Sequence, residues 1–176
     1  METTKWVIDP AHSEIGFKVK HLMISNVKGN FTNYEATIEG EDFKSSPINV
    51  KIESSSIFTN NNDRDAHLKS ADFFDVENFE SILFEGKSLK EVDDDEYKLT
   101  GILTIKGISK EIVLDVEFGG INTDPWGNEK LAFEINGKIN RKDWGLNWNS
   151  ALETGGVLVA DEVKISAEVQ FVKQAS

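Results

Sequence analysis

The chain has 176 residues, no cysteine and a formal net charge of −12. A chain of this length can bury roughly 70% of its unfolded surface around one core, so we expect residues 1–176 to form a single domain. The lack of cysteine excludes disulfides, thiolate catalysis and cysteine-bound zinc. The acidic charge opposes binding to nucleic acid and to anionic lipid surfaces, because both attract basic patches.

No stretch of about 18 apolar residues occurs in the sequence, which argues against a transmembrane helix and against stable membrane insertion. The N-terminal stretch METTKWVIDPAHS has neither the basic start nor the apolar stretch of a signal peptide. We therefore expect a cytoplasmic protein.

Apolar and polar residues alternate with a period of two through most of the chain, which is typical of β-strands with one buried face. In the first such segment Ile15, Phe17 and Val19 share one face, and charged residues occupy the other. One polar face favours antiparallel pairing, since strands of a parallel sheet are apolar on both faces. The predicted strands are residues 14–21, 27–40, 48–57, 81–90, 96–105, 111–120, 130–140 and 162–172.

Most connections between these segments are short and polar. The acidic run EVDDDE (91–96) is interpreted as a solvated turn, and GGINTDPWGN (119–128) as a longer one. The strands have about ten residues, which is longer than the usual five or six. Long strands in up-and-down order favour an all-β, eight-stranded antiparallel barrel over a two-sheet sandwich.

The segment NNNDRDAHLKSADFFD (60–75) interrupts this pattern and predicts a short helix. Asp63 or Asp65 is expected to cap the helix. Arg64 either forms a local ion pair with these aspartates or binds an anionic head group. Phe73 and Phe74 are too apolar to lie in water, so the helix must pack on an apolar surface, and a barrel offers one across an open end.

The sequence contains no nucleophile elbow, P-loop, dinucleotide-binding fingerprint or zinc-protease motif. His12, His21 and His67 could meet at one end of a barrel and form the metal site of a metal-dependent enzyme. No pair of these histidines has the spacing of a usual ligand pair, and hydrogen-bonded imidazoles are the simpler interpretation.

An eight-stranded barrel is close to the size at which side chains either fill the lumen or leave room for one small ligand. The predicted inward faces are apolar and include Gly86, Gly101, Gly137 and Ala167. Small inward residues leave space for a ligand, although glycine in a strand also marks bulges. The pattern therefore predicts a long apolar ligand or, alternatively, a filled structural barrel that acts in protein interaction.

Residues 140–161 form a long irregular segment that contains Trp144 and Trp148. Loops of this length are often functional. Within it, Arg141 and Asp143 predict a structural salt bridge.

Four stretches, in this order, resemble the YceI-like proteins: WVIDPAHSEIGFKVKHLMISNVKGNF (6–31), RDAHLKSADFFD (64–75), LTGILTIKGISKEIVLDVEF (99–118) and INRKDWGLNWN (139–149). The resemblance runs through nearly the whole chain. Two positions depart from it, because Trp144 stands where the family often has Phe and Ala132 where Gly is common.

The resemblance implies a lipocalin-like eight-stranded barrel, with the helix at or near an opening, that holds a polyisoprenoid such as a prenyl chain or a quinone tail. It also implies binding, sequestration or transport without catalysis, no cofactor apart from the lipid, and a homodimer. The family motifs and the phase of the strands together give the expected ligand-contacting residues. These are Ile15, Phe17, Val19, Phe31, Arg64, His67, Leu68, Phe73, Phe74, Phe84, Leu99, Leu103, Leu114, Val116, Phe133, Ile135 and Trp144.

Overall fold

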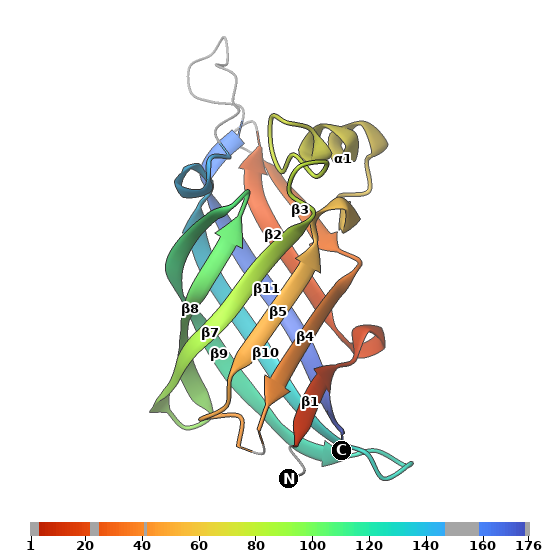
Figure 1. Ribbon diagram of the computed structural model, residues 1–176, viewed down its shortest axis with the longest axis vertical. Helices are drawn as coiled ribbons and strands as arrows, with labels where there is room; N and C mark the ends of the chain where they lie inside the picture. Colours follow the sequence, from red (N-terminus) through yellow and green to blue (C-terminus); the bar gives the residue numbers. More distant parts are fainter. Residues whose placement is uncertain (1–3, 22–24, 41, 147–158, 175–176) are drawn as a thin grey trace.

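The computed structural model describes residues 4–21, 25–40, 42–146 and 159–174, whose strands form a closed antiparallel barrel (Figure 1). The ring order is β1–β4–β5–β7–β8–β9–β10–β11, and pairing of β1 with β11 closes it. The predicted eight-stranded antiparallel barrel is confirmed. The ring strands are β1 (Lys5–Ile8), β4 (Tyr34–Glu39), β5 (Ile48–Glu53), β7 (Ser81–Asp93), β8 (Glu96–Ile105), β9 (Ile108–Thr123), β10 (Glu129–Asn140) and β11 (Val159–Gln174).

Three of the eight walls of the barrel, meaning the chain segments that run along its side, are each interrupted and form two strands. Strand β1 continues into β2 (Glu14–His21), β3 (Ser25–Phe31) into β4, and β5 into β6 (Ile57–Phe58). The first break contains the single 3₁₀ turn Pro10–His12, where Pro10 lacks the N–H that a strand ladder needs. The other two breaks lie side by side, because the Thr32 N–H donates to the Ser56 carbonyl at 3.1 Å.

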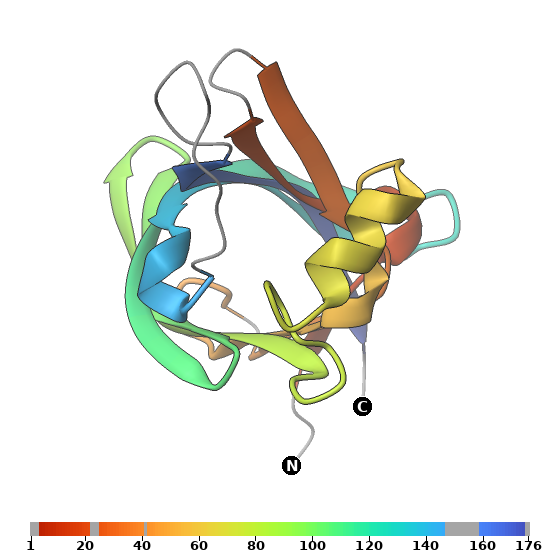
Figure 2. The ribbon, with the colours of Figure 1, turned by 90° about the horizontal axis from the view of Figure 1, so that it is seen from above.

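Beyond these breaks, β2, β3 and β6 form a corner at one end of the barrel, where the orange-red strands of Figure 2 lean away from the ring. Helix α1 (Asn62–Lys69) packs against β6 at this end (Figure 1), as expected for the helix near an opening. Among the described strands β6 pairs with β3 alone, and residues 59–80 connect β6 to β7 along the chain. We call these residues the helical flap.

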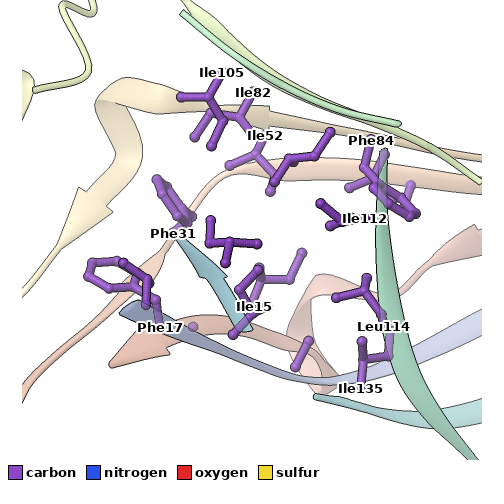
Figure 3. Close-up of a pocket in the computed structure, with 18 of the residues that line it drawn as sticks. Ile15, Phe17, Phe31, Ile52, Ile82, Phe84, Ile105, Ile112, Leu114 and Ile135 are labelled. Atoms are coloured by element: carbon purple, nitrogen blue, oxygen red, sulfur yellow. The ribbon is translucent and has the colours of Figure 1, made fainter. Parts of the chain in front are cut away.

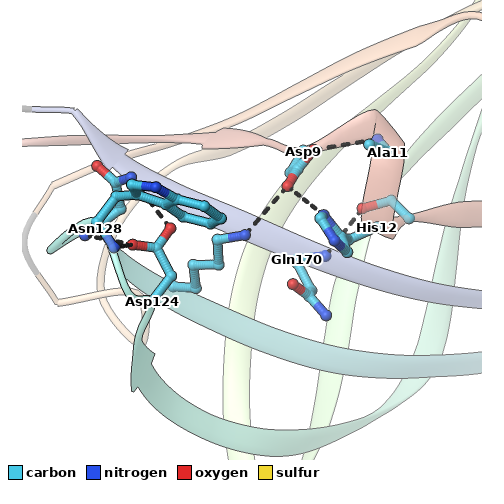
Figure 4. A network of polar contacts seen from close by, with 9 residues as sticks. Asp9, Ala11, His12, Asp124, Asn128 and Gln170 are labelled. Carbon is cyan, nitrogen blue, oxygen red and sulfur yellow. Dashed lines mark hydrogen bonds and ion pairs between the residues drawn. The ribbon is translucent and has the colours of Figure 1, made fainter.

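Polar contacts fasten the break between β1 and β2 to the neighbouring strands (Figure 4). Asp9 contacts the Nδ1 atom of His12 at 2.7 Å and the Nζ atom of Lys130 at 3.4 Å, and its N–H donates to the Gln170 carbonyl at 2.8 Å. Burial acts to raise the pKa of Asp9, but hydrogen bonds from His12, the Ala11 N–H and Lys130 outweigh burial and lower the pKa below its ordinary value. Asp9 therefore favours its charged form at this junction.

The observed strands differ from the predicted ones mainly at their ends. Strand β1 was not predicted, because four residues are too few for alternation to stand out. Strand β7 continues to Asp93 and β8 begins at Glu96, so four of the six residues in the acidic run lie in strands, and β9 extends into the predicted turn as far as Thr123. Exposed acidic side chains do not interfere with the hydrogen bonds between strand backbones. A run of acidic residues therefore did not predict where these strands end.

The long segment after β10 begins with the 3₁₀ turn Arg141–Trp144. Trp148 lies outside the described residues. Within the described ranges, α1 and the three 3₁₀ turns are all too short or too polar to cross a bilayer as helices.

Candidate ligand-binding cavity

The barrel encloses a cavity of about 640 Å³. Isoleucine, leucine and phenylalanine side chains from different strands converge on it in Figure 3. Among the described residues, the polar and charged side chains that line the cavity are Asn61, Asp63, Arg64, His67 and Arg141. The first four belong to the helical flap, and the Arg141–Trp144 turn lies at the same end as α1 (Figure 1). The cavity is therefore apolar along the barrel and polar at one end.

Every residue predicted to contact a ligand lines this cavity, with the exception of Trp144. Those on the strands are Ile15, Phe17, Val19, Phe31, Phe84, Leu99, Leu103, Leu114, Val116, Phe133 and Ile135, and those on the helical flap are Arg64, His67, Leu68, Phe73 and Phe74. Period-two alternation brought the strand residues to one surface, because each strand turns every second side chain inward. Phe31 joins the wall to the flap through edge contact with Phe74, with ring centroids 6.1 Å apart.

Trp144 is buried beside the barrel wall instead of facing the cavity. Its Nε1 atom donates to the Leu103 carbonyl at 2.9 Å, which fixes the 3₁₀ turn to β8. The predicted ion pair within this turn is wrong, because Asp143 is exposed and Arg141 lies 3.9 Å from Asp161. Burial lowers the pKa of Arg141, and the charge of Asp161 partly offsets that effect.

Arg141 acts as a structural tie. Its Nε atom donates to the Ala160 carbonyl at 2.9 Å, and its Nη1 atom donates to the Leu146 carbonyl at 2.5 Å. The first bond connects the end of β10 with the start of β11, and the second holds the chain that follows the 3₁₀ turn. A guanidinium held by several carbonyls is better suited to positioning backbone than to recognising a ligand.

The end of the cavity away from α1 is closed by aromatic side chains. Phe43, Phe133 and Phe171 line the cavity there, and Tyr97 and Phe118 pack behind them. We call these five residues the aromatic floor. Sequence reasoning missed Phe43, because it lies in the polar loop between β4 and β5 and has no strand periodicity to reveal it.

At the opposite end, the start of α1 differs from the predicted cap. Asn61 is the N-cap, and its side chain accepts the Arg64 N–H at 3.0 Å. Asp65 is buried and accepts both the N–H and the hydroxyl of Thr59, at 2.8 and 2.5 Å. The aspartates therefore do not cap the helix as predicted.

Arg64 also lacks the predicted ion pair with its aspartate neighbours. Its Nε atom donates to the Thr59 hydroxyl at 2.8 Å and its Nη2 atom to the Thr59 carbonyl at 2.7 Å. Thr59 thus links Arg64 to the buried Asp65. Within the described part of the chain no bond engages the Nη1 atom of Arg64, and this half-buried side chain lines the cavity.

The histidines with described side chains lie in separate settings. His12 contacts Asp9, while the Nε2 atom of His67 lies 2.9 Å from Asp72. The side chain of His21 lies outside what the structure describes. No group of three or more potential metal-binding side chains occurs among the described residues.

The inward glycines make room for neighbouring side chains. A Cβ atom on Gly101 would lie 2.5 Å from the ring of Phe84 and 2.6 Å from the Glu85 carbonyl, and one on Gly137 would overlap Leu114. The large side chains of Phe84 and Leu114 thus pack over glycines of neighbouring strands. Gly86 adjoins a register shift between β7 and β8, in line with the alternative that glycine marks a bulge.

Comparison with known proteins matches residues 6–171 to the YceI-like domain. A UPF0312 protein of Staphylococcus aureus strain bovine RF122 / ET3-1 is 44% identical over 171 residues, covering 96% of this chain and 97% of that protein. A UPF0312 protein of S. aureus strain USA300 is 43% identical with the same coverage.

Solved structures share the fold over nearly the whole barrel. A YCEI protein of Campylobacter jejuni is 39% identical, covers 93% of this chain and 95% of that chain, and has a TM-score of 0.75. BcnA of Burkholderia cenocepacia, at 20% identity, covers 93% of this chain and 98% of that chain with a TM-score of 0.80. A polyisoprenoid-binding domain from Saccharophagus degradans, at 11% identity, covers 95% and 97% with a TM-score of 0.74. With the family match and the close relatives, these findings show that the chain belongs to the YceI-like family.

Proposed function

We propose that the protein binds an amphiphilic lipid, with an isoprenoid-type tail inside the barrel and a polar head at the α1 end. The observation that carries this proposal is the distribution of polarity in the cavity. Hydrocarbon side chains line its length, and polar side chains gather at one end. Burying a hydrocarbon tail there contributes about 0.8 kcal/mol per carbon, so a long tail needs no strong polar anchor.

The cavity volume indicates the size of the tail. If a chain carbon takes up about the same ~30 Å³ as a water molecule in the liquid, then 640 Å³ holds roughly twenty carbons, or about four isoprene units. The polyisoprenoid-binding domain from S. degradans shares this fold, which supports an isoprenoid as the ligand class.

Arg64 is the proposed contact for the head group. Thr59 holds two of its nitrogens, so the guanidinium is fixed before a ligand arrives, and its Nη1 atom provides a donor at the cavity. A phosphate, carboxylate, hydroxyl or carbonyl oxygen would be a matching acceptor.

We propose a binding or carrier role without catalysis. The described residues that line the cavity include no serine, threonine, cysteine or lysine that could act as a nucleophile.

Organic extraction of the full chain purified from its native host, followed by mass spectrometry, tests the proposal. We expect about one prenyl or other long-chain amphiphile per protein molecule. The proposal fails if the extract holds no such lipid and the extracted protein also binds none of a panel of prenyl alcohols, prenyl phosphates and quinones.

A further inference from the structure

The aromatic floor closes the cavity at the end away from α1. The ring of Phe43 lies 4.7 Å from that of Phe118, 5.2 Å from that of Phe133 and 6.0 Å from that of Tyr97, measured between centroids. Phe133 in turn contacts Phe171 at 6.0 Å. The rings meet edge-on or tilted, which is the favourable arrangement for aromatic pairs.

Phe43 differs from the other rings in its origin. The other rings project from strands β8, β9, β10 and β11, whereas Phe43 enters from the connection between β4 and β5. This connection lies at the lower end of the barrel in Figure 1, opposite α1. Phe43 is nevertheless buried, with 7% of its surface exposed.

The loop around Phe43 is held by its own hydrogen bonds. The side chain of Asp42 accepts the Lys44 N–H at 3.1 Å, and its carbonyl accepts the Ser45 N–H at 3.2 Å. The Glu39 N–H donates to the Pro47 carbonyl at 3.0 Å and fixes the base of the loop. The loop therefore positions the Phe43 ring from below, independently of the barrel wall.

This position gives Phe43 a separate effect on cavity shape. A smaller residue on a strand between the aromatic floor and the α1 end would widen the cavity, whereas a smaller residue at Phe43 would remove part of its floor. Tyr97 and Phe118 contact the Phe43 ring but do not line the cavity, so we expect the space vacated by this ring to extend the cavity toward them.

We propose that Phe43 determines the maximum length of the tail that the cavity accepts, an inference that rests on the proposed lipid-binding function. A tail that enters with its head at the α1 end stops at the Phe43 ring. Homologues longer than the cavity must leave carbons in water and lose the free energy of burying them.

The test uses the full chain after lipid extraction and measures dissociation constants for a series of prenyl alcohols, from geraniol through farnesol and geranylgeraniol to longer homologues. In the wild type, affinity should rise with length and then level off. In Phe43→Ala the plateau should move to longer homologues, with at least about tenfold tighter binding of the first homologue beyond the wild-type plateau. Phe43→Trp should move the plateau in the opposite direction.

Leu131→Ala is the matched control. Leu131 is 1% exposed, pairs with Phe171 across β10 and β11, and does not line the cavity. This variant should lose stability without moving the plateau. An unchanged plateau in Phe43→Ala, or an equal shift in Leu131→Ala, would overturn the inference. If Phe43→Ala does not fold, an unchanged plateau in Phe43→Trp overturns it. Failure of the wild type to bind any homologue would instead count against the proposed function.

Discussion

Arg64, the proposed contact for the head group, shows how hydrogen bonds within the protein can fix a side chain before a ligand arrives. A free arginine loses considerable side-chain entropy when it is immobilised, and that loss weakens binding. Here Thr59 and the buried Asp65 hold the guanidinium in advance through a chain of hydrogen bonds. In the sequence Arg64 stands between two aspartates, which suggests an ion pair. The sequence could not show that Asp65 turns inward to Thr59, because aspartate and arginine can each form hydrogen bonds with a threonine as readily as an ion pair with one another.

Replacing Arg64 with Gln should weaken the binding of a prenyl chain that carries a phosphate or carboxylate head by about 10- to 100-fold, the value of a charge-assisted hydrogen bond. A hydrocarbon of equal length without a head should bind both proteins alike. Titration calorimetry on lipid-extracted protein measures both affinities.

Lys69→Gln is the control for Arg64→Gln, because it removes the same charge from the same helix at a residue that does not line the cavity. An equal loss of affinity in the two variants would show that the charge acts at long range, and would contradict a direct contact of Arg64 with the head group.

At the scale of elements, the strands were predictable and their breaks were not. Alternation identified the eight walls because it is clear within each strand, although the inward-facing phase shifts by one residue at each break, as between Phe31 and Ala36 or between Ile52 and Ile57. The breaks depend on Pro10 and on contacts between distant segments, such as the hydroxyl of Ser54 donating to the Phe79 carbonyl at 2.7 Å. Helix α1 was predicted near an opening, but its cap depended on side-chain geometry that local sequence leaves open.

Asp65 should hold the helical flap in place, because its removal leaves two buried donors of Thr59 without an acceptor. Asp65→Ala should therefore destabilise the flap locally by about 1–3 kcal/mol. Amide hydrogen exchange of residues 62–69 should accelerate, while exchange in β8 to β10 stays unchanged.

Asp63→Ala supplies the comparison for Asp65→Ala, since Asp63 is an exposed aspartate in the same first turn of α1. Its exchange pattern should remain close to that of the wild type. Uniform acceleration across the barrel in Asp65→Ala would mean that the helical flap does not open as a separate unit.

At the scale of the whole molecule, the closed ring and its cavity have a common origin. Strand phase decides which side chains turn inward, so most of the candidate site could be predicted once a barrel was assumed. The alternation of inward and outward residues applies only to strands. It therefore could not reveal Phe43, which lies in a loop, and could not show that Trp144, which lies in a 3₁₀ turn, points away from the cavity. Ring closure also depends on β1, a four-residue strand held between β4 and β11.

The Asp9 contacts make this closure sensitive to pH. The pKa of Asp9 is lower in the folded state than in the unfolded state, where it is about 4. The stabilisation that the Asp9 carboxylate gives to the folded protein is therefore complete above the unfolded-state pKa and is lost as the pH falls through the folded-state pKa. Asp9→Asn should reduce the free energy of unfolding at pH 7 by about 1–2 kcal/mol.

Urea unfolding of wild type and Asp9→Asn between pH 7 and pH 2 measures this effect, and the two stabilities should converge at the acidic end. Asp143→Asn, at an exposed aspartate, should follow the wild-type curve. A constant difference between wild type and Asp9→Asn across the whole range would show that the carboxylate charge is not the cause.

The incomplete pairing of β6 has a kinetic consequence. Elsewhere in the ring, parting two walls means breaking a run of backbone hydrogen bonds at once, a cost close to that of global unfolding. Among the described residues no backbone ladder joins β6 to β7, since the bond from the Ser54 N–H to the Glu80 carbonyl only extends the ladder between β5 and β7, so the barrier there consists chiefly of side-chain packing. Under the proposed function, we expect a lipid to exchange sideways through this gap faster than the barrel unfolds, and its residence time to change in variants whose melting temperature stays unaltered.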